Sequence, residues 1–334
     1  MPAVVTHSFF ANDIFESMEE SRLKDEISVR MNLFRLGSQG PDVFFYYKAP
    51  PWIRYDGLEN LGNLAHDEKV GAFFSESLNY LDQLDRNKDF YDLTVYLTGY
   101  LCHYSLDRTA HPFIHYTSGI DADYNRISWK YHIYHRILES TIDYLSLVKK
   151  GLQPRYYKIY ELIRVQPLKI VSVMEFYEYI LPLIYDTQIS RKQSEELITG
   201  IYKVQKYLYD PLWVKYHFYR LLELIMRRTG GITSSMIPKR LDERLDYLNL
   251  NHKAWSHPCR KEEISRESFW EVYERALIEA VKFIKMVSVF IDSGSIPPGL
   301  VDLIDDISYS SGIKCSSADE LNYFDSIFDG NSHL

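Results

Sequence analysis

The chain has 334 residues, of which 46% are hydrophobic, and this is enough for one large domain or two ordinary ones with a sizeable core. Lysine and arginine number 38 against 46 aspartates and glutamates. The resulting formal charge of −8 argues against the extended basic face of a general nucleic-acid binder. Double-stranded nucleic acid is therefore not an expected partner, although a local phosphate site is compatible with this charge.

Cysteine usage and hydropathy bear on the compartment. The three cysteines, at positions 102, 259 and 315, lie far apart without C-x-x-C spacing, so the pattern indicates neither a disulfide framework nor a thiolate zinc site. No basic region followed by an apolar run of signal-peptide length opens the chain. The longest apolar stretch, 269–291, contains six charged side chains, so no membrane span is expected. We expect a cytoplasmic protein.

Apolar residues recur at three- and four-residue spacing in nearly every long segment, and strand-like alternation is almost absent. This predicts an all-α fold, a multi-helix bundle. In chain order, the pattern predicts an irregular loop over 36–66, rich in glycine and proline, and then helices near 68–85, 88–107, 127–149, 171–186, 190–208, 210–228 and 268–294.

Start and stop signals support these helices. Asp210 and Pro211 suit an N-cap and first helical position, and Ser268 with Glu271 has the spacing of a capping box. Pro112 should end the helix before it, because proline disfavours helical geometry in the residue that precedes it. Pro182 should likewise kink or end its helix.

The chain divides by composition into three parts. Residues 1–150 hold most of the histidines and are the expected metal-binding catalytic half. Residues 151–294 are expected to form a helical half with additional C-terminal helices, packed on the first half in one compact domain. Residues 295–334 are rich in Ser, Gly, Pro and Asp and are expected to form a loosely structured extension.

Two predicted helices each carry an imidazole and a carboxylate one turn apart. His103 and Asp107 are separated by four residues, as are His135 and Glu139, so each pair projects from one helix face. His111 adds a third candidate ligand near the end of the first helix. Helical bundles build multi-metal sites in this way from facing side chains. Imidazole and carboxylate together suit zinc, with manganese or iron possible.

A single His/Asp pair at this spacing is more often a solvated helix face or a satisfied core histidine than a metal site. Two such pairs, together with His66 and Asp42 in the preceding glycine- and proline-rich segment, reverse this preference and favour a metal centre.

Four separated motifs within residues 1–145 resemble, in order, those of the bacterial zinc-dependent phospholipase C family. They are Thr6-His7-Ser8-Phe9-Phe10-Ala11, Gly40-Pro41-Asp42-Val43-Phe44-Phe45, Gly99-Tyr100-Leu101-Cys102-His103-Tyr104-Ser105-Leu106-Asp107 and His135-x-x-x-Glu139. That family shares an all-helical, three-zinc scaffold with single-strand nucleases. The resemblance implies the same scaffold here, with two or three zinc ions.

The resemblance also implies ligands. The first metal would be held by Asp42, His66, His103 and Asp107. The second would be held by His111, His135 and Glu139, with His115 competing with His111 for its place. A third metal would lie between Asp107 and His7. Asp42 and Glu139 are the candidate catalytic residues, and Asp42 could orient the attacking water in addition to binding metal.

The expected activity is phosphodiester hydrolysis by metal-activated water, without a protein nucleophile. The chain contains no G-x-S-x-G elbow, P-loop or H-E-x-x-H pair, which agrees with this expectation. Phospholipid head groups are the expected substrate class, with a soluble phosphodiester as the other possibility. Aromatic residues at 44–47 and 50–55 could enclose a quaternary ammonium or make peripheral contact with a membrane, or could equally be wall packing.

Two alternatives remain at this stage. An HD-type phosphohydrolase would use the adjacent pair His66 and Asp67, and it would leave His135 and Glu139 without an obvious role. A non-catalytic helical protein would instead hold structural metals and bind a partner through the region after residue 150.

Overall fold

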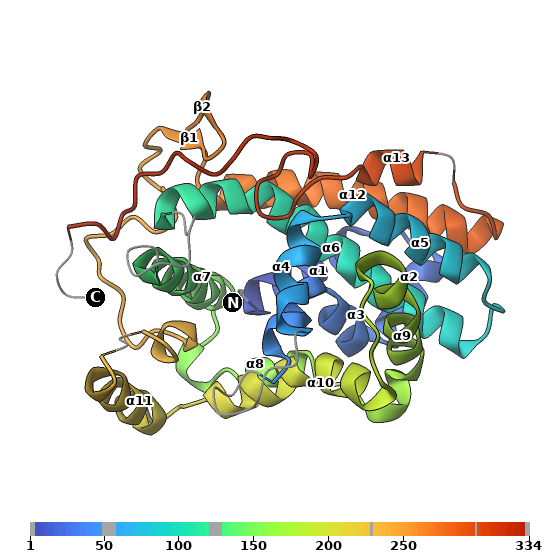
Figure 1. Ribbon diagram of the computed structural model, residues 1–334, viewed down its shortest axis with the longest axis horizontal. Helices are drawn as coiled ribbons and strands as arrows, with labels where there is room; N and C mark the ends of the chain where they lie inside the picture. Colours follow the sequence, from blue (N-terminus) through green and yellow to red (C-terminus); the bar gives the residue numbers. More distant parts are fainter. Residues whose placement is uncertain (1–3, 49–57, 120–128, 228–229, 298, 331–334) are drawn as a thin grey trace.

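The computed structural model describes residues 4–48, 58–119, 129–227, 230–297 and 299–330, and its fold is all-α, as predicted (Figure 1). The α-helices are α1 (Val4–Ser17), α2 (Arg22–Ser28), α3 (Met31–Gly37), α4 (Leu61–Asp67), α5 (Val70–Asp82), α6 (Lys88–Ser118), α7 (Trp129–Lys149), α8 (Ile159–Leu162), α9 (Val171–Tyr185), α10 (Arg191–Leu208), α11 (Val214–Ile225), α12 (Phe269–Ser293) and α13 (Leu300–Ile304). Short 3-10 helices are η1 (Gly40–Tyr46), η2 (Leu58–Asn60), η3 (Pro154–Tyr156), η4 (Pro167–Lys169) and η5 (Thr233–Ser235). Strands β1 (Trp255–His257) and β2 (Arg260–Ser265) form an antiparallel hairpin in which Trp255 pairs with Ser265.

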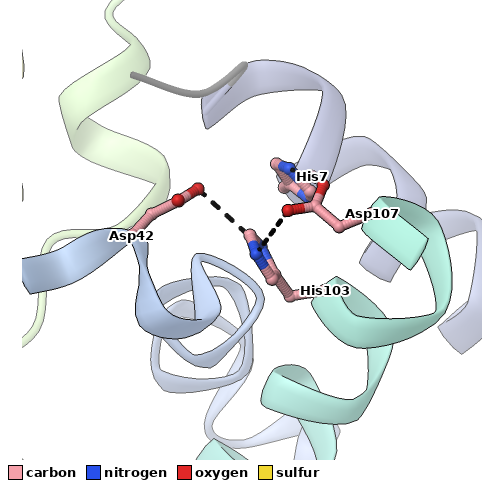
Figure 2. A group of neighbouring side chains, drawn as sticks. All are labelled: His7, Asp42, His103 and Asp107. Atoms are coloured by element: carbon pink, nitrogen blue, oxygen red, sulfur yellow. Dashed lines mark ion pairs between the residues drawn. The ribbon is translucent and has the colours of Figure 1, made fainter. Parts of the chain in front are cut away.

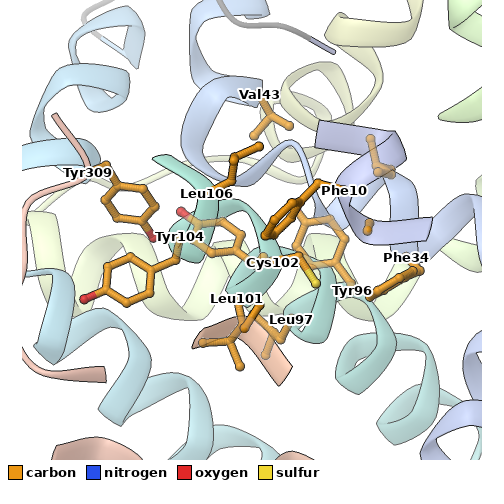
Figure 3. Close-up of a cluster of buried hydrophobic side chains, with 14 of the residues drawn as sticks. Phe10, Phe34, Val43, Tyr96, Leu97, Leu101, Cys102, Tyr104, Leu106 and Tyr309 are labelled. Carbon is orange, nitrogen blue, oxygen red and sulfur yellow. The ribbon is translucent and has the colours of Figure 1, made fainter. Parts of the chain in front are cut away.

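Helix α6 is the axis of the molecule, because α1, α3, α7, α9 and α12 all pack against it (Figure 1). Nearly all of its side chains from Phe90 to Ser118 are buried, which no ordinary surface helix shows. Figure 3 shows part of the core around this helix, where Phe10, Phe34 and Tyr309 gather from segments far apart in the sequence. Because other helices surround α6, its backbone is held in place and its polar side chains point into the interior of the protein.

Helices α3 and α6 cross in backbone contact at two glycines. A Cβ atom on Gly37 would lie 2.0 Å from the carbonyl oxygen of Tyr96, and one on Gly99 would lie 2.2 Å from that of Phe34. Gly40 follows with a positive φ of 51°, and a Cβ there would lie 2.3 Å from the His103 ring. Because α3 and α6 cross so closely, η1 begins directly beside the His103 ring.

The predicted end of the helix at Pro112 is wrong, because α6 continues through this proline to Ser118. Proline removes one helical N–H and so deprives the carbonyl four residues earlier, that of Arg108, of its usual partner. Gly312 from the C-terminal segment packs against this carbonyl, and a Cβ at Gly312 would lie 2.4 Å from the oxygen. Tertiary packing thus accommodates the break in the helical hydrogen-bond series.

Other local differences have similar causes. The segment predicted as an irregular loop over 36–66 contains the end of α3, then η1, η2 and most of α4, and residues 49–57 lie outside the described part. Helix α11 begins at Val214 rather than near Asp210, although the Asp210 carboxylate still accepts hydrogen bonds from the N–H groups of Val214 and Tyr216. The capping box at Ser268 and Glu271 is present as predicted.

The C-terminal segment 299–330 contains little regular structure beyond α13, yet several of its side chains are buried, including Tyr309 and Phe328. It lies along α6 and α12 at the top of Figure 1. The division of the chain into residues 1–150, 151–294 and 295–334 stays a prediction. None of the helices in the described ranges has the length and apolar character that a membrane crossing requires.

Candidate metal centre

Four side chains from three elements converge in the interior. His7 comes from α1, Asp42 from η1, and His103 and Asp107 from α6 (Figure 2). One potential ligand atom of each lies within 4.8 Å of those of the others, and all four residues are buried. The Asp107 carboxylate lies 2.8 Å from His103 Nε2 and 3.1 Å from His7 Nε2.

His66 from α4 adjoins this first group. Its Nε2 lies 3.3 Å from Asp42 Oδ1 and 3.8 Å from Asp107 Oδ2. Asp67, the next residue, is exposed, and its carboxylate accepts a hydrogen bond from the Ser308 hydroxyl rather than joining the group. The HD-type alternative requires His66 and Asp67 to bind metal together, but only His66 faces the first group.

A second group lies next to Asp107, whose Oδ2 is 3.6 Å from His111 Nδ1. His111 from α6 and His135 and Glu139 from α7 place ligand atoms within 4.8 Å of one another. Glu139 Oε1 lies 3.0 Å from His135 Nε2 and 3.6 Å from His111 Nε2. The His135 side chain is 19% exposed, whereas that of His103 is fully buried, so the second group is the more open one. His115 lies nearby, with its ring centre 5.1 Å from that of His135.

Backbone carbonyls orient three of the imidazoles. The Nδ1 atom of His66 lies 2.6 Å from the Gly62 carbonyl oxygen, that of His103 lies 3.2 Å from Ser38, and that of His111 lies 2.9 Å from Tyr309. In each case this contact directs Nε2 toward the carboxylates, as expected of a metal-binding imidazole. The sequence does not reveal these carbonyl partners, because any residue type can supply one.

The carboxylates and imidazoles shift one another's pKa values. Burial alone would raise the pKa of Asp107, but His103, His111 and His7 outweigh this effect and hold the pKa well below its usual range. Burial would lower the pKa of His111, yet Asp107 and Glu139 raise it to about 10. Burial dominates at His103 and lowers its pKa. The Asp107 carboxylate is thus held ionised, in the form that binds a cation.

The donor set fits zinc on two counts. It consists of nitrogen and carboxylate ligands without thiolates, a combination that zinc accepts in catalytic sites. In addition, four buried atoms of the first group have no hydrogen bond of good geometry within the described structure: His7 Nδ1, Asp42 Oδ2, His103 Nε2 and Asp107 Oδ2. Buried polar atoms are rarely left in this state unless an ion or water completes them.

The aromatic residues flanking the centre divide into two sets. Phe44 and Tyr47 are buried in the core and serve as wall packing, whereas the Phe45 ring is half-buried with its centre 5.4 Å from that of His66. The predicted aromatic contacts at 50–55 lie outside the described residues.

Comparison with known families bears on the identity of this centre. The sequence model of the zinc-dependent phospholipase C family matches residues 6–194, which is more than half of the chain. The chain belongs to the zinc-dependent phospholipase C family. The match covers α1, η1, α4, α6 and α7, and so every element that contributes a side chain to the two groups. No curated protein and no solved structure matches the chain significantly.

Proposed function

We propose that the protein is a zinc-dependent phosphodiester hydrolase of the phospholipase C type. The observation that carries this proposal is the convergence of two ligand groups, from α1, η1, α4, α6 and α7, in a member of the zinc-dependent phospholipase C family. A single closed structural site needs only four ligands. The larger number of ligands and the partial exposure of the second group favour catalysis over a purely structural role.

The chain's own residues would take distinct roles. His7, Asp42, His66, His103 and Asp107 would hold metal on the buried side, and His111, His135 and Glu139 on the open side. Bound zinc would supply an activated water and neutralise phosphoryl oxygens. Asp42 would orient the attacking water, since its Oδ2 has no hydrogen-bond partner in the described structure. Glu139 would hold the metal of the more open second group from α7.

A small, partly open cavity of about 60 Å³ lies next to α7 and η1, and it is the place that we propose for substrate, although none of its lining residues is a candidate metal ligand. On α7 it is lined by Ser140, the residue after Glu139, and by Asp143, one turn beyond Glu139, and Tyr46 lines it from η1. Tyr157 and Trp213 contribute aromatic wall. Mixed aromatic and polar side chains suit contact with a phospholipid head group, and this is the substrate class that we propose.

Metal exchange followed by assay tests the proposal. The purified protein should contain two or three zinc ions per chain and lose activity on chelation, and added zinc should restore it. Release of a phosphorylated head group from short-chain phosphatidylcholine is the primary readout, with bis(p-nitrophenyl) phosphate as a soluble ester. Glu139→Gln should abolish turnover, whereas Asp67→Ala should retain it. Absence of metal-dependent turnover on every phosphodiester tried would reject the proposal.

A further inference from the structure

Helix α11 presents a row of large apolar side chains to solvent. Val214, Phe218, Leu221 and Ile225 follow one another at spacings of four, three and four residues and so share one helix face. Ile225 is 73% exposed, Val214 66% and Phe218 58%. Leu222 and Leu224 border the same row and are also exposed. We call these six side chains the α11 apolar face. Apolar surface that is contiguous in this way marks an interaction site in a folded protein.

The opposite face of α11 attaches the helix to the protein through polar contacts. The buried Glu223 carboxylate accepts hydrogen bonds from the N–H groups of Gly230 and Thr233, at 3.0 and 2.9 Å, and from the Thr233 hydroxyl at 2.7 Å. The hydroxyl of the buried Tyr219 bonds to that of Tyr207 on α10. A surface helix ordinarily buries its apolar side and exposes its polar side. In α11 the arrangement is reversed, so the fold itself does not account for the apolar face.

The segment that contains this face is basic, although the whole chain is acidic. Residues 203–227 carry five basic side chains and two acidic ones, whereas the protein as a whole has a formal net charge of −8. Both acids are occupied within the fold, since Glu223 is buried and Asp210 accepts hydrogen bonds from the start of α11. Lys206 and Arg227 are exposed and Arg220 is half-buried, whereas Lys215 donates hydrogen bonds to the carbonyl oxygens of Tyr207 and Tyr209. A large apolar face on a helix whose polar side chains are basic is the pattern of helices that lie in the interface of anionic membranes.

The apolar face also lies next to the proposed substrate cavity. Trp213, the residue before α11, lines that cavity together with Tyr46 and Asp143. In Figure 1, α11 is at the lower left, apart from α6 and α12. A membrane bound at this helix would therefore lie close to the cavity that Trp213 lines.

We propose that α11 inserts its apolar face into a membrane surface that contains anionic phospholipid, with the basic side chains at the level of the head groups. This inference deepens the proposed function and rests on it for the choice of a lipid surface as the occupant. A second copy of the chain fits less well, because pairing two of these faces would bring two basic segments together.

Vesicle sedimentation tests the inference with the full chain. Vesicles of phosphatidylcholine with 30% phosphatidylserine should bind the protein more tightly than pure phosphatidylcholine, and high salt should reduce the difference. The variant Phe218→Asp with Ile225→Asp should weaken binding at least tenfold. The matched control is Ile278→Asp with Val289→Asp, which places the same charges at two exposed apolar positions on α12 and should bind normally.

Hydrolysis of bis(p-nitrophenyl) phosphate separates this inference from the proposed function. We expect the α11 variant to keep this activity and to lose hydrolysis of vesicle lipid. Vesicle binding without any metal-dependent hydrolysis would support the membrane surface and reject the proposed enzyme. Active protein that binds no vesicle, or a variant that binds as the wild type does, would overturn the membrane inference. So would a wild-type dimer that the α11 substitutions convert to a monomer without any vesicle binding.

Discussion

Asp107 links the residues of the centre. Its carboxylate lies within 4 Å of four imidazoles, those of His7, His66, His103 and His111, which come from three different helices. These groups are shielded from bulk solvent, because Asp107 is 4% exposed and His103 is fully buried. A carboxylate in this position compensates the positive charge of bound metal and, without metal, that of protonated histidines.

We therefore expect Asp107→Asn to weaken metal binding by at least about 100-fold. Substituting a residue that only hydrogen-bonds to a metal ligand costs up to about 100-fold in affinity, and loss of a ligand should cost no less. The measurement is competition for zinc with a coloured chelator, with circular dichroism to establish that the variant is folded. Asp67→Ala is the matched control, because its carboxylate lies one residue from His66 yet bonds to Ser308. A folded Asp107→Asn protein with unchanged zinc content would show that this carboxylate is not a ligand.

The pKa of His111 predicts how the metal-free protein responds to pH. Since the folded pKa is raised to about 10 from 6.5, the protonated ring stabilises the fold fully below pH 6.5, and this contribution is lost as the pH rises toward 10. The free energy of unfolding of chelated protein should fall over this range, by at most about 5 kcal/mol. Urea titrations at several pH values measure it. His111→Gln should flatten the dependence, and an equally steep curve in that variant would contradict the assignment.

At the scale of elements, the start of α1 depends on a side chain from α7. The buried Asp143 carboxylate accepts hydrogen bonds from the N–H groups of Val5 and Thr6, at 3.0 and 2.8 Å, and from the Thr6 hydroxyl at 2.7 Å. These are N–H groups at the first turn of a helix, which have no partner within the helix. Because Thr6 precedes His7, the same contact holds His7, the candidate ligand from α1, in place.

Asp143→Ala should destabilise the protein by about 2–4 kcal/mol, because it leaves two buried N–H groups without an acceptor. It should also weaken metal binding at the first group while leaving His111, His135 and Glu139 in place. Chemical denaturation with zinc titration measures both effects. Asp143→Asn keeps one acceptor oxygen and should lie between the wild type and Asp143→Ala. Wild-type stability in the alanine variant would exclude this role.

The contact between the C-terminal segment and α6 gives a second prediction for an element. Gly312 has a φ of 71°, and a Cβ there would lie 2.4 Å from the Arg108 carbonyl oxygen. Gly312→Ala should cost about 1–3 kcal/mol from strain and displacement, and should disturb the nearby Tyr309 carbonyl that contacts His111. Gly299→Ala is the control, since it also has a positive φ but no atom within 4 Å of the added Cβ. Equal thermal melting of the two variants would argue against the contact.

For the whole molecule, the candidate centre joins segments that are distant in sequence. Its side chains extend from His7 to Glu139, and the backbone of Tyr309 adds a contact from near the other end of the chain. Metal bound to the folded state alone stabilises it by about 2.7 kcal/mol when the free metal is 100 times the dissociation constant. Chelation should therefore affect global unfolding rather than a single loop.

We expect chelator to lower the melting temperature by roughly 5 °C or more, at a few degrees per kcal/mol for a chain of this size, and added zinc to restore it. Differential scanning calorimetry measures the shift. The Asp107→Asn variant should respond less to chelator than the wild type does. An unchanged melting temperature in the wild type would show that metal does not join these segments.

Spacing along the sequence was enough to predict the all-α class and the pairs His103 with Asp107 and His135 with Glu139, because helix geometry alone places residues four apart on one face. The four motifs were enough to indicate the family. Both inferences rest on relations within single segments.

The tertiary structure decided what depends on contacts between segments. The close crossing of α3 and α6 brings Asp42 to His103, and Gly312 allows α6 to continue past Pro112. The Tyr309 carbonyl contacts His111 from a segment about 200 residues away. The outward apolar face of α11 is visible only once the opposite face is seen to be attached through Glu223. Sequence periodicity shows that a helix has two faces, but only packing determines which of them meets solvent.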